Sequence, residues 1–223
     1  MTSLTARALL FDMDGTLVDS AESIDRVWRE FAGRHRLDPA TVLAALPGRT
    51  AHDIVAGFLP AAEVTAEVAW IRAREEATAD TVTEIPGARR LLTSLPDRTW
   101  AVVTSASRTM TERRLTAAGL PLPAVAVCAD DVRSGKPDPE GFRAAARLLD
   151  VDIADCVLFE DSAPGLLAAR RSGGTPVAVA ALTTEPAAYR VDDLTALTAR
   201  PQDGRIHLEI TQAQTELAEG IRR

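Results

Sequence analysis

Three aspartates lie close together in the segment FDMDGTLVDS, residues 11–20. The first two, Asp12 and Asp14, directly follow the apolar run ALLF (8–11), which is typical of a buried strand. Carboxylates repel one another and resist desolvation, so their crowding at the end of a core strand lowers stability unless something compensates. A bound cation would compensate, because oxygen ligands suit Mg²⁺. The spacing therefore predicts a magnesium site at the end of a strand.

Polar side chains also follow two later apolar runs. Thr104 and Ser105 end one run, and Glu160 and Asp161 end another. The loop SGKPDP contains Lys136, which is the single lysine among the chain's 25 lysines and arginines. A lysine ammonium is a compact point charge that the planar fork of arginine does not imitate. Together these groups offer carboxylates for Mg²⁺, hydroxyls for phosphate oxygens and one cation.

Five short apolar runs alternate with helical patterns along most of the chain. The runs are rich in valine and alanine without polar alternation, as expected for strands buried on both faces. This alternation predicts an α/β fold with a Rossmann-like, doubly wound parallel sheet covered on both sides. Parallel strands end at one common edge, so the polar residues that follow them should converge there. The runs are ALLFD (8–12), TWAVVTS (99–105), AVAVCAD (124–130), DCVLFED (155–161) and TPVAVA (175–180).

The region 21–85 breaks this alternation, because it has helical periodicity and no convincing strand. Four consecutive helices are expected there, separated by Pro47-Gly48 and Pro60. We therefore predict a small α-helical cap, residues 21–85, inserted into an α/β core formed by residues 1–20 and 86–223. The third aspartate, Asp19, precedes Glu22 by three residues, which predicts a capping box with Asp19 as the N-cap of the first cap helix.

Composition limits the classes of partner. The 223 residues are 46% hydrophobic with a net charge of −7, which argues against nucleic acid or an anionic membrane as the main partner. No segment is long enough to span a membrane, and no signal peptide is evident. Cys128 and Cys156 lie in strand-like runs and are expected to be reduced. These features predict a cytoplasmic protein, and the net charge says little against a small anionic substrate.

The motif residues occur in the order found in one known family. The chain resembles the haloacid dehalogenase-like hydrolases over nearly its whole length, including a helical cap after the first motif. It is most similar to the sugar and polyol phosphatases of that family, such as glycerol-3-phosphatases, 2-deoxyglucose-6-phosphatases and hexitol phosphatases. The motifs that carry the resemblance are DMDGT (12–16), TS (104–105), KP (136–137) and ED (160–161).

The resemblance implies a Mg²⁺-dependent phosphomonoesterase. Asp12 would be the nucleophile that forms an aspartyl-phosphate, and Asp14 would be the general acid and base. Mg²⁺ would be held by Asp12, the backbone carbonyl of Asp14, and Asp161, with Glu160 as an outer partner. A separate set would hold the phosphoryl group: Thr104, Ser105, the backbone amide of Ala106, and Lys136. The substrate would be a small phosphorylated sugar or polyol.

Substrate choice should depend on the cap. The stretch GRTAHD (48–53) resembles the cap segment that faces the active site in these phosphatases, so Arg49 is expected to contact substrate. The relatives often have a histidine before the glycine, whereas this chain has Pro47. This difference weakens the inference from the relatives to a particular substrate.

Other functions fit the sequence less well. Haloacid dehalogenases proper lack an aspartate at the position of Asp14, and phosphonoacetaldehyde hydrolases need a cap lysine that this chain does not have. β-Phosphoglucomutases carry a histidine in the first cap helix where this chain has Ile24. A phospho-accepting receiver domain would have its aspartate after the third strand and no helical insert. A non-catalytic binding module stays open as an alternative, although every motif residue is present.

Overall fold

A central sheet organises the molecule in the computed structural model, which describes residues 2–180, 184–211 and 214–215. Six parallel strands run in the order β9-β8-β7-β2-β5-β6, and β12 adds an antiparallel edge beside β9. The predicted doubly wound parallel sheet is thereby confirmed. The strands are β2 (Ala8–Phe11), β5 (Trp100–Val103), β6 (Ala126–Val127), β7 (Cys156–Glu160), β8 (Thr175–Val179), β9 (Tyr189–Val191) and β12 (Gln214–Thr215).

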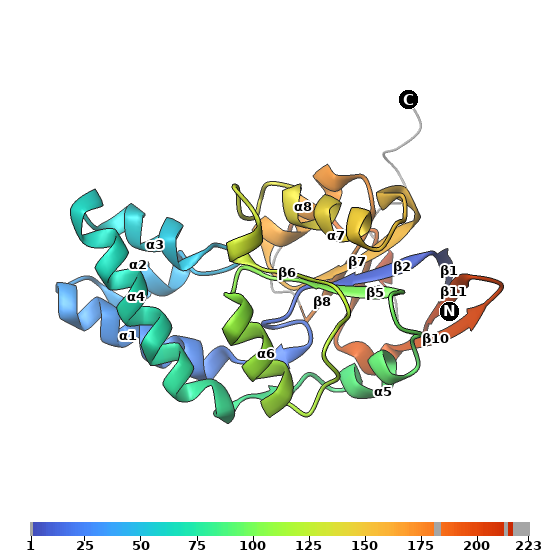
Figure 1. Ribbon diagram of the computed structural model, residues 1–223, viewed down its shortest axis with the longest axis horizontal. Helices are drawn as coiled ribbons and strands as arrows, with labels where there is room; N and C mark the ends of the chain where they lie inside the picture. Colours follow the sequence, from blue (N-terminus) through green and yellow to red (C-terminus); the bar gives the residue numbers. More distant parts are fainter. Residues whose placement is uncertain (1, 181–183, 212–213, 216–223) are drawn as a thin grey trace.

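Helices cover both faces of this sheet (Figure 1). On one face, α7 (Glu140–Leu148) and α8 (Ala163–Ser172) pack on Leu10 and Leu158 through residues such as Phe142. On the other, α5 (Ala88–Thr93) and α6 (Arg108–Ala117) bury leucines against Phe11 and Phe159. Alternate residues of β2 thus enter opposite apolar layers, so its run is continuously hydrophobic. Every residue of β2, β5 and β7 is buried.

Four further helices lie at one end of the sheet (Figure 1): α1 (Ala21–His35), α2 (Pro39–Ala44), α3 (Ala51–Phe58) and α4 (Ala61–Thr78). They enclose their own apolar cluster, which includes Phe31, Val55 and Ile71. This cluster supports our proposed division into an α/β core (1–20 and 86–223) and a helical cap (21–85). The expectation that 21–85 has no strand is wrong by one short element, since β3 (Val18–Asp19) pairs antiparallel with β4 (Thr83–Glu84). Two residues are too few to produce a recognisable alternation.

A second sheet lies at the opposite end of the core (Figure 1). It pairs β1 (Thr2–Ala6), β11 (Arg205–Ile210) and β10 (Leu197–Gln202) in the antiparallel order β1-β11-β10. Asp203 and Gly204 both have positive φ and join β10 to β11, which is the geometry of a two-residue hairpin turn. The dipeptide Asp203-Gly204 is typical of such a turn. The sequence analysis did not predict β1, a short alternating segment of which Ala6 alone is buried.

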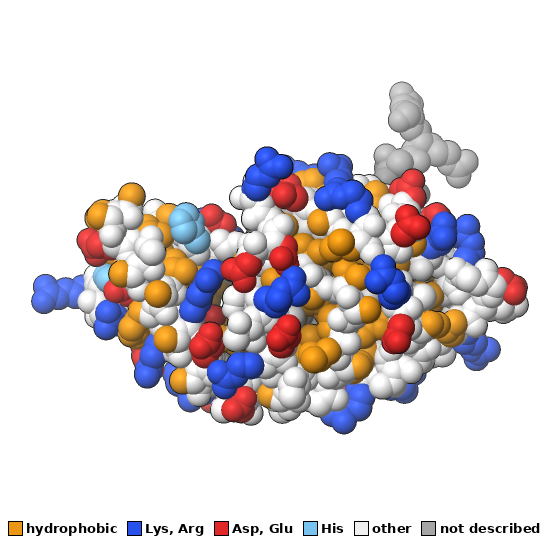
Figure 2. All heavy atoms as spheres, viewed as in Figure 1, with side chains coloured by type: hydrophobic (Ala, Val, Ile, Leu, Met, Phe, Trp, Pro, Cys, Tyr) orange, Lys and Arg blue, Asp and Glu red, His pale blue; other side chains and the backbone are white. Residues whose placement is uncertain are grey.

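The cysteines are buried, and the surface carries charges of both signs. Cys128 and Cys156 are buried and unpaired, as predicted. On the face shown in Figure 2, acidic and basic side chains are interspersed rather than segregated. Within the described residues, no helix combines the length and the apolar character that crossing a membrane requires.

Candidate active site

The strand ends of the sheet open into a cavity of about 1060 Å³ between the core and the cap helices. Core residues from the ends of β2, β5 and β7 line one side, and residues of α1, α3 and α4 line the other. Of the residues predicted for the site, Glu160 alone does not line the cavity. The structure therefore brings together Asp12, Asp14, Arg49, Thr104, Ser105, Ala106, Lys136 and Asp161.

Lys136 lies between two buried carboxylates at the floor of the cavity. Its ammonium forms ion pairs with Asp12 and, at 2.5 Å, with Glu160. Burial lowers the pKa of Lys136, but the two carboxylates outweigh burial and raise that pKa above its usual value. Burial also raises the pKa of Asp12 to about 8; Lys136 opposes this shift and Glu160 adds to it. Two carboxylates therefore share one cation at this point.

Glu160 is fixed by the start of α8. Its Oε2 accepts hydrogen bonds from the backbone amide and the hydroxyl of Ser162, both at 3.0 Å. The Ser162 hydroxyl in turn accepts a hydrogen bond from the amide of Gly165, and Ser162 is thereby the N-cap residue of α8. A Cβ on Gly165 would lie 1.9 Å from the Glu160 carboxyl carbon. The glycine thus permits the close approach that holds Glu160 against Lys136.

Gly165→Ala is expected to lower both stability and activity. The added methyl group would force Glu160 or α8 to move, and overpacking of this kind costs about 1–3 kcal/mol of unfolding free energy. Gly33→Ala is the matched control, because Gly33 lies in α1 and a methyl group added there would have nothing within 4 Å. Thermal denaturation and phosphatase assays should show loss for Gly165→Ala and none for Gly33→Ala. Equal stability of the two variants would contradict the packing argument.

Three carboxylates form a cluster that fits a divalent cation. Oxygens of Asp12, Glu160 and Asp161 lie within 4.8 Å of one another. The pKa of Asp161 is raised well above its usual value, first by burial and then by the charges of Glu160 and Asp12. A hard cation would offset this repulsion, and an all-oxygen donor set suits Mg²⁺. Gly15 has a φ of 83°, and a Cβ there would lie 2.2 Å from Asp161 Oδ2, so the loop after β2 needs a glycine to approach Asp161.

The loop after β5 presents hydroxyl and amide groups to the cavity. The Thr104 hydroxyl accepts a hydrogen bond from the Ala106 amide at 3.1 Å. Ser105 donates its hydroxyl to the backbone carbonyl of Gly48, a cap residue, at 3.1 Å. These groups therefore already have partners within the protein. That they bind phosphate stays a prediction. Binding would require the Ser105 hydroxyl and the Ala106 amide to exchange these hydrogen bonds for bonds to the ligand.

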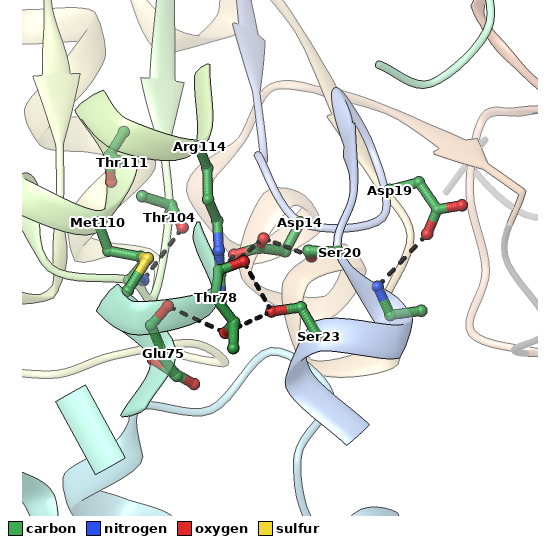
Figure 3. Close-up of polar contacts among 12 residues, drawn as sticks. Asp14, Asp19, Ser20, Ser23, Glu75, Thr78, Thr104, Met110, Thr111 and Arg114 are labelled. Carbon is green, nitrogen blue, oxygen red and sulfur yellow. Dashed lines mark hydrogen bonds and ion pairs between the residues drawn. The ribbon is translucent and has the colours of Figure 1, made fainter. Parts of the chain in front are cut away.

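Asp14 has two partners that the sequence analysis did not identify (Figure 3). Its Oδ1 accepts from the Ser20 hydroxyl at 2.6 Å, and both of its oxygens lie 2.9 Å from Nη1 of Arg114. Arg114 belongs to α6, a hundred residues along the chain, and its side chain is 2% exposed. One signal in the sequence could have found it, since Met110, Thr111 and Leu115 place Arg114 on the buried stripe of the helix.

The predicted capping box at Asp19 is wrong. The first cap helix begins at Ala21, so Ser20 is its N-cap residue, and Asp19 belongs to β3. The Asp19 carboxylate accepts only a long bond from the Ala21 amide, at 3.3 Å. Ser20 makes no side-chain capping bond because its hydroxyl is directed to Asp14. The hydrogen bond from Ser20 to Asp14 thus takes the place of a side-chain cap on α1.

On the cap side, Arg49 is exposed at the cavity wall. Its Nη2 donates to the backbone carbonyl of Asp53 at 2.9 Å, which holds the guanidinium against the start of α3. Ile24 of α1 also lines the cavity. The predicted contact of Arg49 with substrate remains a proposal, because the structure gives it a partner in the protein.

Known proteins share both this sequence pattern and this architecture. The family model of the haloacid dehalogenase-like hydrolases matches residues 6–173. Hexitol phosphatase A of Escherichia coli is 36% identical over 194 residues, covering 85% of this chain and 90% of the relative. The 2-deoxyglucose-6-phosphate phosphatase 2 of Saccharomyces cerevisiae is 31% identical over 204 residues, covering 80% and 82%. A crystal structure of β-phosphoglucomutase from Clostridium difficile has a TM-score of 0.76 at 21% identity, covering 86% and 93%, which is a likeness of fold alone.

Proposed function

Because the chain belongs to the haloacid dehalogenase-like hydrolases and is a phosphatase of that family, we propose that it hydrolyses small phosphorylated sugars or polyols. The observation that carries this proposal is the cavity above Asp12, whose cap wall places charged side chains among apolar ones. That wall includes the charged side chains of Asp25, Arg49, Arg72 and Glu75. Hydroxyl groups of a sugar or polyol can exchange hydrogen bonds with such groups, whereas an apolar alcohol cannot.

In the first step, an Asp12 oxygen attacks phosphorus and the bond between phosphorus and the leaving oxygen breaks. The product is an aspartyl-phosphate, and the leaving alcohol takes a proton from Asp14. Lys136 contacts the nucleophile directly and supplies a positive charge where the phosphoryl oxygens would lie. Ser105 and the amide of Ala106 would orient those oxygens.

In the second step, water attacks the phosphorus of the aspartyl-phosphate. Asp14, now a carboxylate, takes a proton from this water, and the bond between phosphorus and Asp12 breaks to release inorganic phosphate. Mg²⁺, when held by Asp12, Asp161 and the backbone carbonyl of Asp14, would neutralise repulsion between the nucleophile and the phosphate. Glu160 lines no part of the cavity, and its role would be to hold the Lys136 ammonium in place through their ion pair.

A mutase would use the same first step, and Ile24 argues against it. A mutase must pass the phosphoryl group to a second sugar hydroxyl instead of water, which calls for an acid or base on the cap. The Ile24 side chain lines the cavity where the mutases carry histidine, and it neither donates nor accepts a proton. We therefore expect hydrolysis.

Incubation with hexose and polyol phosphates plus Mg²⁺ should release inorganic phosphate in proportion to the alcohol formed. In ¹⁸O-labelled water, the heavy isotope should enter the phosphate rather than the alcohol, because water attacks phosphorus. Omission of Mg²⁺ is the control and should abolish release. Conversion of β-glucose 1-phosphate to glucose 6-phosphate with little free phosphate would replace this proposal with the mutase.

A further inference from the structure

Arg114 is a buried arginine whose guanidinium is only partly hydrogen-bonded. Nη1 alone makes hydrogen bonds, both to Asp14, whereas Nε and Nη2 are buried and have no hydrogen-bond partner among the described residues. A buried donor without a partner is destabilising, and the cost is greater for a charged group. An apolar side chain of similar length would fill the same space without that cost. Packing alone therefore does not explain why arginine occupies this position.

The one ion pair of Arg114 among the described residues is with Asp14, and it restrains that carboxyl group from one side (Figure 3). Ser20 donates to Oδ1 from the other side, so Oδ1 has two donors and Oδ2 has only Arg114. Asp14 remains partly open, with its side chain 22% exposed at the cavity. Oδ2 is thus the oxygen that remains available to exchange a proton with a ligand.

Helix α6 connects the restraint on Asp14 to the loop after β5, which is predicted to bind phosphate. The helix begins at Arg108, shortly after Thr104, Ser105 and Ala106, and carries Arg114 on its buried face. One rigid element therefore sets both the position of the phosphate loop and the position of Asp14. Glu75 of α4 is also near: burial raises its pKa, and the charge of Arg114 opposes that shift. The guanidinium is thus close enough to a cap carboxylate to affect the pKa of that group.

We propose that Arg114 is a positioning residue, which holds the Asp14 carboxyl group so that Oδ2 faces the leaving oxygen of the substrate. The inference rests on the proposed function, in which Asp14 protonates that oxygen. A carboxyl group that rotates freely would spend much of its time misdirected, and a small misplacement of a catalytic group costs about 10²-fold in rate. Arg114 itself does not need to touch the substrate.

A series of substituted phenyl phosphates tests this role, because their leaving groups differ in basicity but hardly in shape. Proton donation matters for a basic leaving group and little for a weakly basic one, while contacts with the cap cancel along the series. For the most basic member, kcat/KM should fall by about 10²–10⁴-fold in Asp14→Asn, the range typical of a lost general acid. It should fall by about 10²-fold in Arg114→Met, and by less in Arg114→Lys, which keeps a charge. For the least basic member, all three should stay within about tenfold of wild type.

Arg113→Met is the matched control, since Arg113 is the neighbouring residue of α6, is 40% exposed and lies 3.7 Å from Asp80. Its dependence on leaving-group basicity should equal that of wild type. The inference is overturned if Arg114→Met and Arg114→Lys also follow wild type while Asp14→Asn steepens the dependence. If Asp14→Asn itself has no effect on the slope, the proposed acid role fails instead. Melting temperatures identify any variant that does not fold, and Arg114→Lys still decides the question if Arg114→Met is lost.

Discussion

Asp12→Asn should abolish turnover and leave the fold intact. An amide does not form an acyl-phosphate, so the loss in kcat should be about 10⁴-fold or more, as when a nucleophile is removed. The substitution is isosteric, and the amide oxygen can still accept from Lys136, which also keeps its partner Glu160. Steady-state phosphate release with a polyol phosphate and Mg²⁺ measures the loss. Turnover within about tenfold of wild type would exclude Asp12 as the nucleophile.

The same variant has a signature in stability. In the absence of Mg²⁺, the pKa of Asp12 is raised to about 8, well above its unfolded value. Between these values the native protein holds a proton that the unfolded chain lacks, so this group's contribution to stability falls as pH rises. Asparagine has no such loss. The melting temperature of Asp12→Asn relative to wild type should therefore increase from about pH 5 to about pH 8. A constant difference would show that Asp12 ionises normally.

Lys136→Arg should inactivate the enzyme even though it conserves charge. Lys136 is 8% exposed and lies between Asp12 and Glu160 with the ring of Phe142 nearby, so a guanidinium does not fit without moving its partners. Displacement of the nucleophile by even about 1 Å would cost about 10²-fold in rate. The chain uses arginine almost everywhere else, which makes this substitution a direct test of whether the lone lysine is incidental.

Arg171→Lys is the matched control for that experiment. Arg171 lies in α8, is exposed, and donates to the backbone carbonyl of Pro137, the residue after Lys136. Arg171→Lys is thus also an exchange between arginine and lysine, at a position beside the same loop but outside the cavity. Its kcat should equal that of wild type. Near-normal kinetics in Lys136→Arg would refute the role assigned to the ammonium.

The parallel sheet was predictable because strands buried on both faces are apolar at nearly every position. β2 is a continuous apolar run followed by Asp12, and β7 is an apolar run that ends in Glu160 and is followed by Asp161. Such apolar runs are typical of strands at the centre of a parallel sheet. The small sheet at the far end was harder to predict. β1 alternates over five residues, and its identity as a strand depends on pairing with β11, some two hundred residues later. Local pattern cannot supply that distant partner.

The convergence of the candidate site residues was predictable where they follow strands and not where they come from helices. Asp12 and Asp161 occupy strand ends, and parallel topology brings such ends together. Arg114 follows Arg113 in a helix of an arginine-rich chain, so residue type alone does not identify which of the two is buried. Asp19 was wrongly predicted as the N-cap for a related reason, because the local sequence pattern does not reveal that the Ser20 hydroxyl binds Asp14.

The short ribbon formed by β3 and β4 brings together the two ends of the inserted helical block. Val18 lies opposite Glu84 and Asp19 opposite Thr83, so the chain leaves and re-enters the core at neighbouring points. The whole helical block therefore connects two paired antiparallel strands, as the loop of a hairpin does. Loops of very different length can be accommodated at such a junction, since closure depends only weakly on the number of residues between its ends. Evolution or design can thus graft a new block onto this stem and alter substrate choice while the chemical machinery stays in place.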